Sequence, residues 1–145
     1  MNTIRILALC DMGDSTLVYM EKTEPVMLQK PMEEFLNEMC MMFGSDVKGR
    51  RSASKYLLNV TQRAPIPFCP ERKGILFYAP STDNKTTWIQ YWFVEKFRKS
   101  ERGTSILFKD GTQLTVGIGY RSIKNQIRRC KKLQRLIDEA MGKEW

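Results

Sequence analysis

Six basic side chains recur at helical spacing near the C-terminal end of the 145-residue sequence. At about 100° per residue they fall on one face of a helix predicted over about residues 121–141, opposite an apolar face that includes Ile123, Ile127 and Cys130. The six are Arg121, Lys124, Arg128, Lys131, Lys132 and Arg135. With no acid among them they repel one another unless a polyanion lies close, so this face predicts contact with nucleic-acid phosphates. The alternative is a solvated basic face that salt makes tolerable.

A second group of cations lies in residues 44–55, a segment with two glycines and three serines. This composition predicts a mobile basic loop, or a loop leading into a short helix. Its cations are Lys48, Arg50, Arg51 and Lys55.

The net charge changes sign where this segment begins. Residues 1–47 carry three basic and eight acidic side chains, a net charge of −5, whereas residues 48–145 carry 21 basic and eight acidic ones, a net charge of +13. Such an asymmetry predicts a polyanionic partner for the last two thirds of the chain, and nucleic acid is the obvious one.

Catalytic and metal chemistry find little support in the sequence. There is no histidine, which excludes every histidine-dependent triad and general base. The four cysteines are far apart in the chain, which disfavours a zinc site and suggests buried, reduced thiols. We therefore expect no enzyme, no catalytic residue, no cofactor and no metal. No apolar run reaches the roughly 18–20 residues of a membrane span, so we expect a cytoplasmic protein without a membrane partner.

The elements that must position these cations follow from periodicity. Apolar runs predict a hairpin of Ile4–Cys10 and Thr16–Glu21, with a short third strand at Val26–Gln29. A helix is predicted near residues 31–43, because apolar residues recur there at i, i+3, i+4, i+7 and i+8. Further strands are predicted at Tyr56–Val60 and Ile75–Ala79, and the prolines at 65, 67 and 70 indicate an extended connection between them.

A long aromatic strand, Trp88–Phe97, is predicted next. Its alternation puts Ile89, Tyr91 and Phe93 toward the core, and leaves Trp88, Gln90 and Trp92 either as an exposed interface or buried under a helix. Strands Thr104–Phe108 and Gln113–Ile118 flank an Asp-Gly turn, a strong hairpin signal. Gly117-x-Gly119 is a weak nucleotide-loop signal, and a glycine-softened exit from the strand explains it better. The sequence as a whole predicts a single α+β domain over 1–145, with a mostly antiparallel sheet and the two helices near 31–43 and 121–141.

The order of several short motifs between about residues 40 and 133 resembles the ComK family of competence transcription factors of Gram-positive bacteria. The motifs are Phe43-Gly44-Ser45, Gly49-Arg50, Pro65-Ile66, Ile75–Phe77, Trp88-Ile89, Lys96-Phe97, the Asp-Gly hairpin and Tyr120-x-Ser122-x-x-Asn125-Gln126-x-x-Arg129. The Gly-Ser and Tyr-x-Ser segments together are fairly specific for this family.

The resemblance implies an oligomeric transcriptional regulator of competence genes that binds double-stranded, AT-rich DNA at paired boxes, from the minor-groove side, and associates with the nucleoid. A narrow A-tract minor groove has an enhanced negative potential and attracts arginines. Arg50 and Arg51 are the candidates for insertion, although the same segment could instead cap a neighbouring helix. Paired boxes call for symmetric subunits, so a homo-oligomer is expected.

The family motif leaves two interpretations of the C-terminal helix open. In one, Asn125 and Arg129 touch DNA together with Gln126, while the cations hold phosphates. In the other, Asn125 and Gln126 tie the helix to the hairpin through backbone hydrogen bonds, and only the cations meet DNA.

Members of the family extend several dozen residues further, and the adaptor protein MecA reads that extension and delivers the protein to the ClpC protease. The sequence ends at Trp145, so tail-dependent degradation through a MecA/ClpC-type adaptor is not expected, and the protein could occupy sites without activating. The alternative function is a protein-interaction module or a ComK antagonist, with an acidic N-terminal third that binds a partner and a basic face that binds polyanions non-specifically. RNA binding through the aromatic strand is a third hypothesis.

Overall fold

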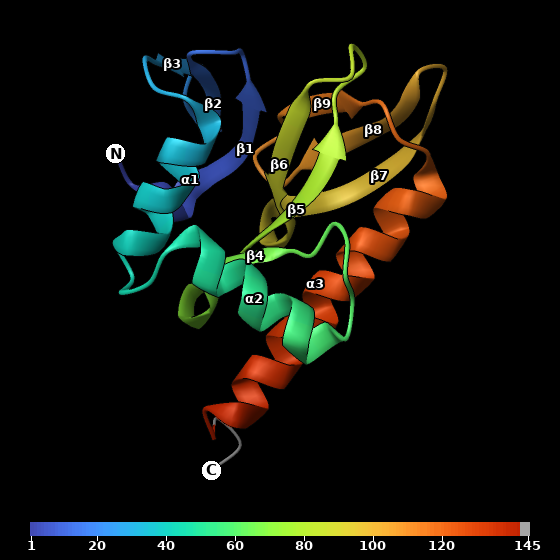
Figure 1. Ribbon diagram of the computed structural model, residues 1–145. Coiled ribbons are helices and arrows are strands. Elements are labelled where there is room, and N and C mark those ends of the chain that lie inside the picture. Colours follow the sequence, from blue (N-terminus) through green and yellow to red (C-terminus); the bar gives the residue numbers. More distant parts are fainter. Residues whose placement is uncertain (143–145) are drawn as a thin grey trace.

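A computed structural model gives the structure of residues 1–142, in which two antiparallel sheets pack with three α-helices (Figure 1). The first sheet has six strands in the order β3-β2-β1-β6-β5-β4. Its strands are β1 (Ile6–Asp11), β2 (Thr16–Met20), β3 (Val26–Leu28), β4 (Ile66–Cys69), β5 (Gly74–Pro80) and β6 (Thr86–Gln90). The predicted α+β class, the N-terminal hairpin and the short third strand are confirmed. Proline-containing β4 forms an edge of the sheet, where a missing N–H is tolerated.

The second sheet has three strands in the order β7-β8-β9. These are β7 (Val94–Ser100), β8 (Gly103–Phe108) and β9 (Gln113–Val116). The Asp-Gly hairpin between β8 and β9 is confirmed. The two sheets meet where Ser81 bridges Val116 and where the Gly117 amide donates to the Pro80 carbonyl at 2.7 Å.

The helices are α1 (Met32–Met41), α2 (Val47–Leu58) and α3 (Tyr120–Ala140), and three short 3-10 turns are η1 (Thr3–Arg5), η2 (Pro70–Arg72) and η3 (Tyr91–Phe93). Helices α1 and α3 confirm the predictions near 31–43 and 121–141. In α1 the apolar face from Met32 to Cys40 is buried as its spacing predicts. Its last expected member, Phe43, lies beyond the helix end and is 37% exposed.

Of the two alternatives for residues 44–55, the loop leading into a short helix is confirmed and the mobile loop is wrong, because α2 begins at Val47. The predicted strand Tyr56–Val60 is also wrong, because its first three residues belong to α2. The Asp46 carboxylate accepts a hydrogen bond from the Gly49 amide at 2.7 Å and caps the first turn. Ser54 and Leu58, four residues apart, are both buried. Capping and packing at helical spacing thus outweigh the weak helix propensity of the glycine and serines.

The predicted strand Trp88–Phe97 is also wrong, because η3 divides it and passes the chain from one sheet to the other. Trp88 and Gln90 are both buried, so they form neither an exposed interface nor a platform for stacking RNA bases. The Gln90 amide nitrogen donates to the carbonyls of Ile4 and Ile6. Only Trp92 of that predicted face is exposed, at 42%.

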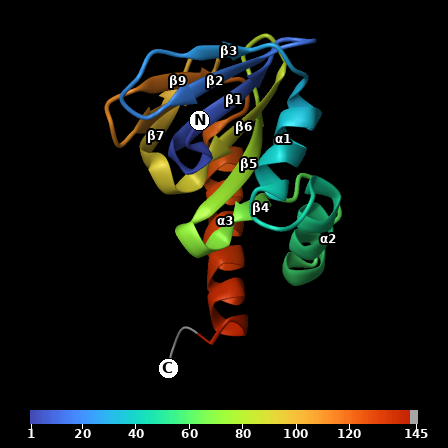
Figure 2. The ribbon, with the colours of Figure 1, turned by 90° about the vertical axis from the view of Figure 1, so that its left-hand side faces the viewer.

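Both faces of the six-stranded sheet are covered. Leu76 and Trp88 belong to a hydrophobic cluster with α1, whereas Phe77 and Ile89 belong to a cluster with the three-stranded sheet and α3. Because alternate strand residues point to opposite faces, α1 and α3 lie on opposite sides of the sheet. Helix α2 lies beside β4 at the edge of the sheet, as Figure 2 shows, with Val47 packed on the α1 side and Leu58 on the α3 side.

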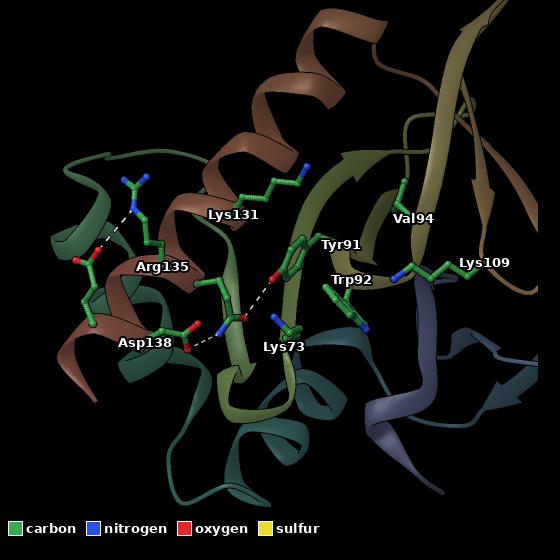
Figure 3. Close-up of a pocket in the computed structure, with 10 residues that line it drawn as sticks. Lys73, Tyr91, Trp92, Val94, Lys109, Lys131, Arg135 and Asp138 are labelled. Carbon is green, nitrogen blue, oxygen red and sulfur yellow. Dashed lines mark hydrogen bonds and ion pairs between the residues drawn. The ribbon is translucent and has the colours of Figure 1, made fainter. Parts of the chain in front are cut away.

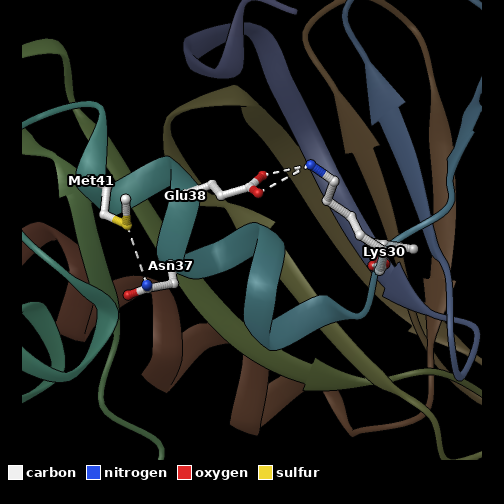
Figure 4. A network of polar contacts seen from close by, with 5 residues as sticks. Lys30, Asn37, Glu38 and Met41 are labelled. Carbon is white, nitrogen blue, oxygen red and sulfur yellow. Dashed lines mark hydrogen bonds and ion pairs between the residues drawn. The ribbon is translucent and has the colours of Figure 1, made fainter.

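The start of α2 is fixed to α1 through Asn37. The Asn37 Oδ1 atom accepts from the Val47 amide at 3.0 Å, and Nδ2 donates to the Met41 sulfur at 3.3 Å (Figure 4). On the same helix, both Glu38 oxygens accept from the Lys30 amino group, at 2.9 and 3.1 Å. These hydrogen bonds raise the pKa of Lys30. The Glu38 carboxylate thereby balances the positive charge of one of the few cations in the acidic N-terminal third.

Candidate nucleic-acid interface

All six predicted cations of α3 are exposed, while the opposite face of the helix is buried. The buried face is made of Ile123, Gln126, Ile127, Cys130, Leu133 and Gln134. The helix is therefore held by apolar packing, and its charged face is left to solvent. We define this charged face, with the residues 121, 124, 128, 131, 132 and 135, as the α3 basic face.

The three-stranded sheet adds a cation to the N-terminal part of this face. Lys99 of β7 lines a cleft of about 850 Å³ together with Arg121, Lys124 and Arg128. Among the described residues, no acidic side chain lines this cleft. The rings of Phe97 and Tyr120 pack with centroids 4.9 Å apart and hold β7 against the first turn of the helix. A cleft with four cations and no counter-charge suits phosphate groups.

The C-terminal part of the α3 basic face borders a second pocket. Lys131 and Arg135 line it from α3, opposite Trp92 (Figure 3). Here the expectation of a face free of acids is only partly met, because Glu139 lies 3.9 Å from the Arg135 guanidinium. Two lysines from outside α3, Lys73 and Lys109, complete this pocket.

The family-motif residues lie on the other flank of α3. Asn125 is exposed and Gln126 is buried, and both line a pocket with Arg63. The Arg129 guanidinium donates to the Gln62 carbonyl at 3.0 Å and to the Arg63 carbonyl at 3.5 Å. Arg129 therefore ties α3 to the loop between α2 and β4, which is a structural role that the sequence did not specify. Contacts of these residues with DNA stay a prediction.

The basic residues of α2 are held by protein contacts. Arg50 donates to the Phe43 carbonyl at 3.0 Å, just beyond the end of α1, as in the helix-capping alternative. Arg51 forms an ion pair with Glu33 at 3.1 Å, and its guanidinium carbon lies 5.4 Å from the centre of the Trp88 ring. These arginines do not extend from a mobile loop, although Lys48 and Lys55 are exposed.

The two groups of predicted cations are not brought together on one surface. Arg51 and Lys55 line a pocket with Tyr78 and Trp88, on the α1 side of the six-stranded sheet. The cations of α3 lie on the opposite side. Sequence reasoning also missed Lys73, Lys99 and Lys109, which reach the α3 basic face from a turn, a strand and a strand end.

The thiols and carboxylates offer no reactive centre within residues 1–142. All four cysteines are unpaired, and burial raises the pKa of each thiol, to about 11 for Cys40. Protonated thiols are poor nucleophiles and poor metal ligands at neutral pH. The described residues contain no group of three or more acidic or cysteine side chains placed to hold a metal ion. Within the same part of the chain, no helix is long and apolar enough to span a bilayer.

The turn that carries Lys109 is fixed by Asp110, which gives a pH-dependent prediction. Burial alone would raise the pKa of Asp110, but hydrogen bonds from the amides of Lys22, at 2.8 Å, and Thr112, at 2.9 Å, outweigh it and lower the pKa. The stability from this carboxylate is therefore present above the ordinary aspartate pKa of about 3.9 and is lost as the pH falls through the lower folded-state value. We expect Asp110→Asn to lower the free energy of unfolding at pH 7 and to approach wild type at strongly acidic pH, in urea titrations of both proteins. An equal difference at all pH values would contradict this role.

Two sequence comparisons relate the chain to known proteins. The model of the ComK protein family matches residues 1–142. The competence transcription factor of Bacillus subtilis (strain 168) is 28% identical over 120 residues, which cover 79% of this chain and 62% of the relative. The chain thus spans less than two thirds of the length of the curated relative that it matches. No solved structure matches the chain. Because the family model covers nearly the whole of it, the chain belongs to the ComK family.

Proposed function

We propose that this protein is a ComK-type transcriptional regulator that binds AT-rich duplex DNA through the α3 basic face. Membership of the family and the similarity to a competence transcription factor support a regulator. The observation that carries the proposal is the row of six exposed cations on α3, with Lys99 placed opposite three of them.

The physical basis is the release of counterions from the DNA backbone. Each phosphate that a lysine or arginine neutralises releases condensed cations, so affinity falls steeply with salt. These contacts position the protein but carry no sequence information. A preference for A/T boxes then comes from the narrow minor groove of A-tracts, whose enhanced negative potential favours arginines such as Arg121 and Arg128.

We also propose that the protein self-associates on DNA. Two boxes in one promoter are best matched by two copies related by a two-fold axis, since symmetric sites mirror symmetric proteins. Trp88 and Gln90 do not serve as the interface, because they are buried in each subunit.

A second candidate function, a protein-interaction module, is favoured by one surface feature. Met1, Met41 and Met42 are 55%, 58% and 64% exposed. The Thr3 hydroxyl lies 3.8 Å from the Met42 sulfur, so the chain start and the end of α1 are adjacent. Exposed methionines are common at adaptable binding surfaces.

A salt titration distinguishes the two functions. We expect binding to a duplex with paired A/T boxes to be at least tenfold tighter than to a G·C-rich duplex of equal length. For six phosphate contacts the slope of log K against log salt is about −5, and the affinity falls about 10³-fold between 50 and 200 mM salt. Fluorescence anisotropy of labelled duplexes measures both quantities. Equal, weak binding to both duplexes would leave the basic face as a generic polyanion surface and favour the interaction module.

A further inference from the structure

An exposed tryptophan lies between two lysine amino groups at the C-terminal end of the α3 basic face. The Lys109 nitrogen lies 3.9 Å from the centre of the Trp92 ring, and the Lys73 nitrogen 4.6 Å from it. In Figure 3 the two amino groups are on either side of the indole. Trp92 is 42% exposed, although most large apolar side chains of this protein are buried.

The backbone fixes all three residues. Lys73 adopts a left-handed conformation with φ of 60° and closes the η2 turn, its amide donating to the Pro70 carbonyl at 3.1 Å. The Lys109 amide donates to the Phe93 carbonyl at 2.9 Å, which joins the β8 end to the η3 turn that carries Trp92. The two lysines thus start from anchored positions on both sides of the ring.

The indole orders the two amino groups without neutralising them. A free lysine side chain loses rotamer entropy when it binds a ligand. Attraction to the ring face of tryptophan restricts that freedom beforehand. Unlike an ion pair, this contact uses none of the N–H donors of the ammonium group. Both lysines therefore keep their N–H donors for an anion.

The charged residues around Trp92 indicate which kind of anion binds there. The pocket around Trp92 has a volume of about 430 Å³ and includes Lys131 and Arg135 of the α3 basic face. Its two acids are already engaged: Glu139 lies 3.9 Å from the Arg135 guanidinium, and Asp138 accepts from the Gln134 amide nitrogen at 3.1 Å. The positive surface of α3 thus continues into this pocket, which favours a phosphate of the same polymer that α3 binds.

We propose that Trp92, Lys73 and Lys109 form a phosphate clamp that extends the DNA-backbone contacts beyond α3. The inference rests on the proposed function and deepens it. Trp92 is the positioning residue of the clamp, and the two lysines contact the phosphates. The duplex backbone then passes from the cleft at Arg121 along α3 to the clamp.

The test uses the full chain and four variants. Trp92→Leu keeps every charge but removes the ring, and we expect it to weaken binding to the A/T duplex about fivefold to tenfold, with little change in salt slope. Trp92→Phe keeps an aromatic face and should stay within about twofold of wild type. Lys73→Gln/Lys109→Gln should reduce the magnitude of the salt slope by about 1.8. Lys85→Glu lowers the net charge by the same two units at an exposed site between β5 and β6, and it controls for net charge.

The possible outcomes test the clamp separately from the proposed function. Loss in Trp92→Leu and in the Lys73/Lys109 variant, with the control near wild type, supports the clamp. Wild-type binding in both variants overturns the clamp and leaves the proposed function intact. Failure of the unmodified protein to bind either duplex overturns the proposed function and the DNA role of the clamp together. A titration with inorganic tripolyphosphate, followed by the indole N–H resonance of Trp92, then distinguishes a site for free phosphates from no anion site.

Discussion

Replacing Lys124 and Arg128 together by glutamine will lower the affinity for an A/T-box duplex by about 60-fold in 0.1 M salt. Both cations line the cleft with Lys99, where no acidic side chain of the described chain offsets them. Loss of two phosphate contacts reduces the magnitude of the salt slope by about 1.8, which amounts to this factor at that salt concentration. Anisotropy titrations at several salt concentrations give the slope directly.

The control for this experiment is a protein of identical net charge. Lys85→Glu lowers the net charge by the same two units at an exposed site between β5 and β6. Equal losses of affinity in the two variants would mean that overall charge, and not the α3 basic face, determines binding. Both variants change only exposed side chains, so their free energies of unfolding should match that of the wild type within about 0.5 kcal/mol.

Replacing Gly117 by serine will destabilise the fold by about 3 kcal/mol, at the upper end of the range for overpacking. A Cβ atom at this position would lie 2.4 Å from the Ser81 carbonyl oxygen and 3.1 Å from its carbon. Both are backbone atoms, so they cannot move aside without separating the two sheets. The Gly117 amide also donates to Pro80, and this hydrogen bond would be lost with the contact. Urea unfolding followed by circular dichroism measures the effect.

Gly119→Ser provides the matched substitution two residues away. A Cβ atom there meets nothing within 4 Å, and Gly119 is the N-cap of α3, where serine is favoured. We expect this variant to be as stable as wild type or slightly more stable. If the two serine variants unfold at the same urea concentration, the close approach at Gly117 is not what holds the sheets together.

The elements that the sequence predicted correctly include those that bury only one face. Helices α1 and α3 were found because apolar side chains recur on one face, and the β8–β9 hairpin because Asp110-Gly111 fixes the turn. Helix α2 was predicted only as an alternative to a mobile loop, and its last turn was predicted as a strand, because Gly49 and its serines are weak helix formers; Asp46 as an N-cap would have favoured the helix. The residues from Trp88 to Gln90 show no alternation of buried and exposed side chains, because both faces of the sheet are covered there.

The candidate interface was predicted only in part, for a related reason. The α3 cations share one helix, so their spacing alone places them on a common face. Lys73, Lys99 and Lys109 come from three separate segments, and only the packing of the second sheet against α3 brings them to that face. The contacts of Lys73 and Lys109 with the Trp92 ring join separate segments of the chain, so no periodic pattern in the sequence predicts them.

The central strand pair of the six-stranded sheet joins distant parts of the chain, since Ala8 pairs with Ile89 and Leu9 with Trp88. Closing a loop of about 80 residues costs about 4 kcal/mol of chain entropy, so this pairing forms late in folding. During synthesis the β1–β2 hairpin leaves the ribosome first, and β6 follows about 3.5 to 14 s later at ordinary elongation rates. Until then the edge of β1 that later pairs with β6 has no partner, and an unpaired edge of an apolar strand is the kind of surface that aggregates or recruits a chaperone.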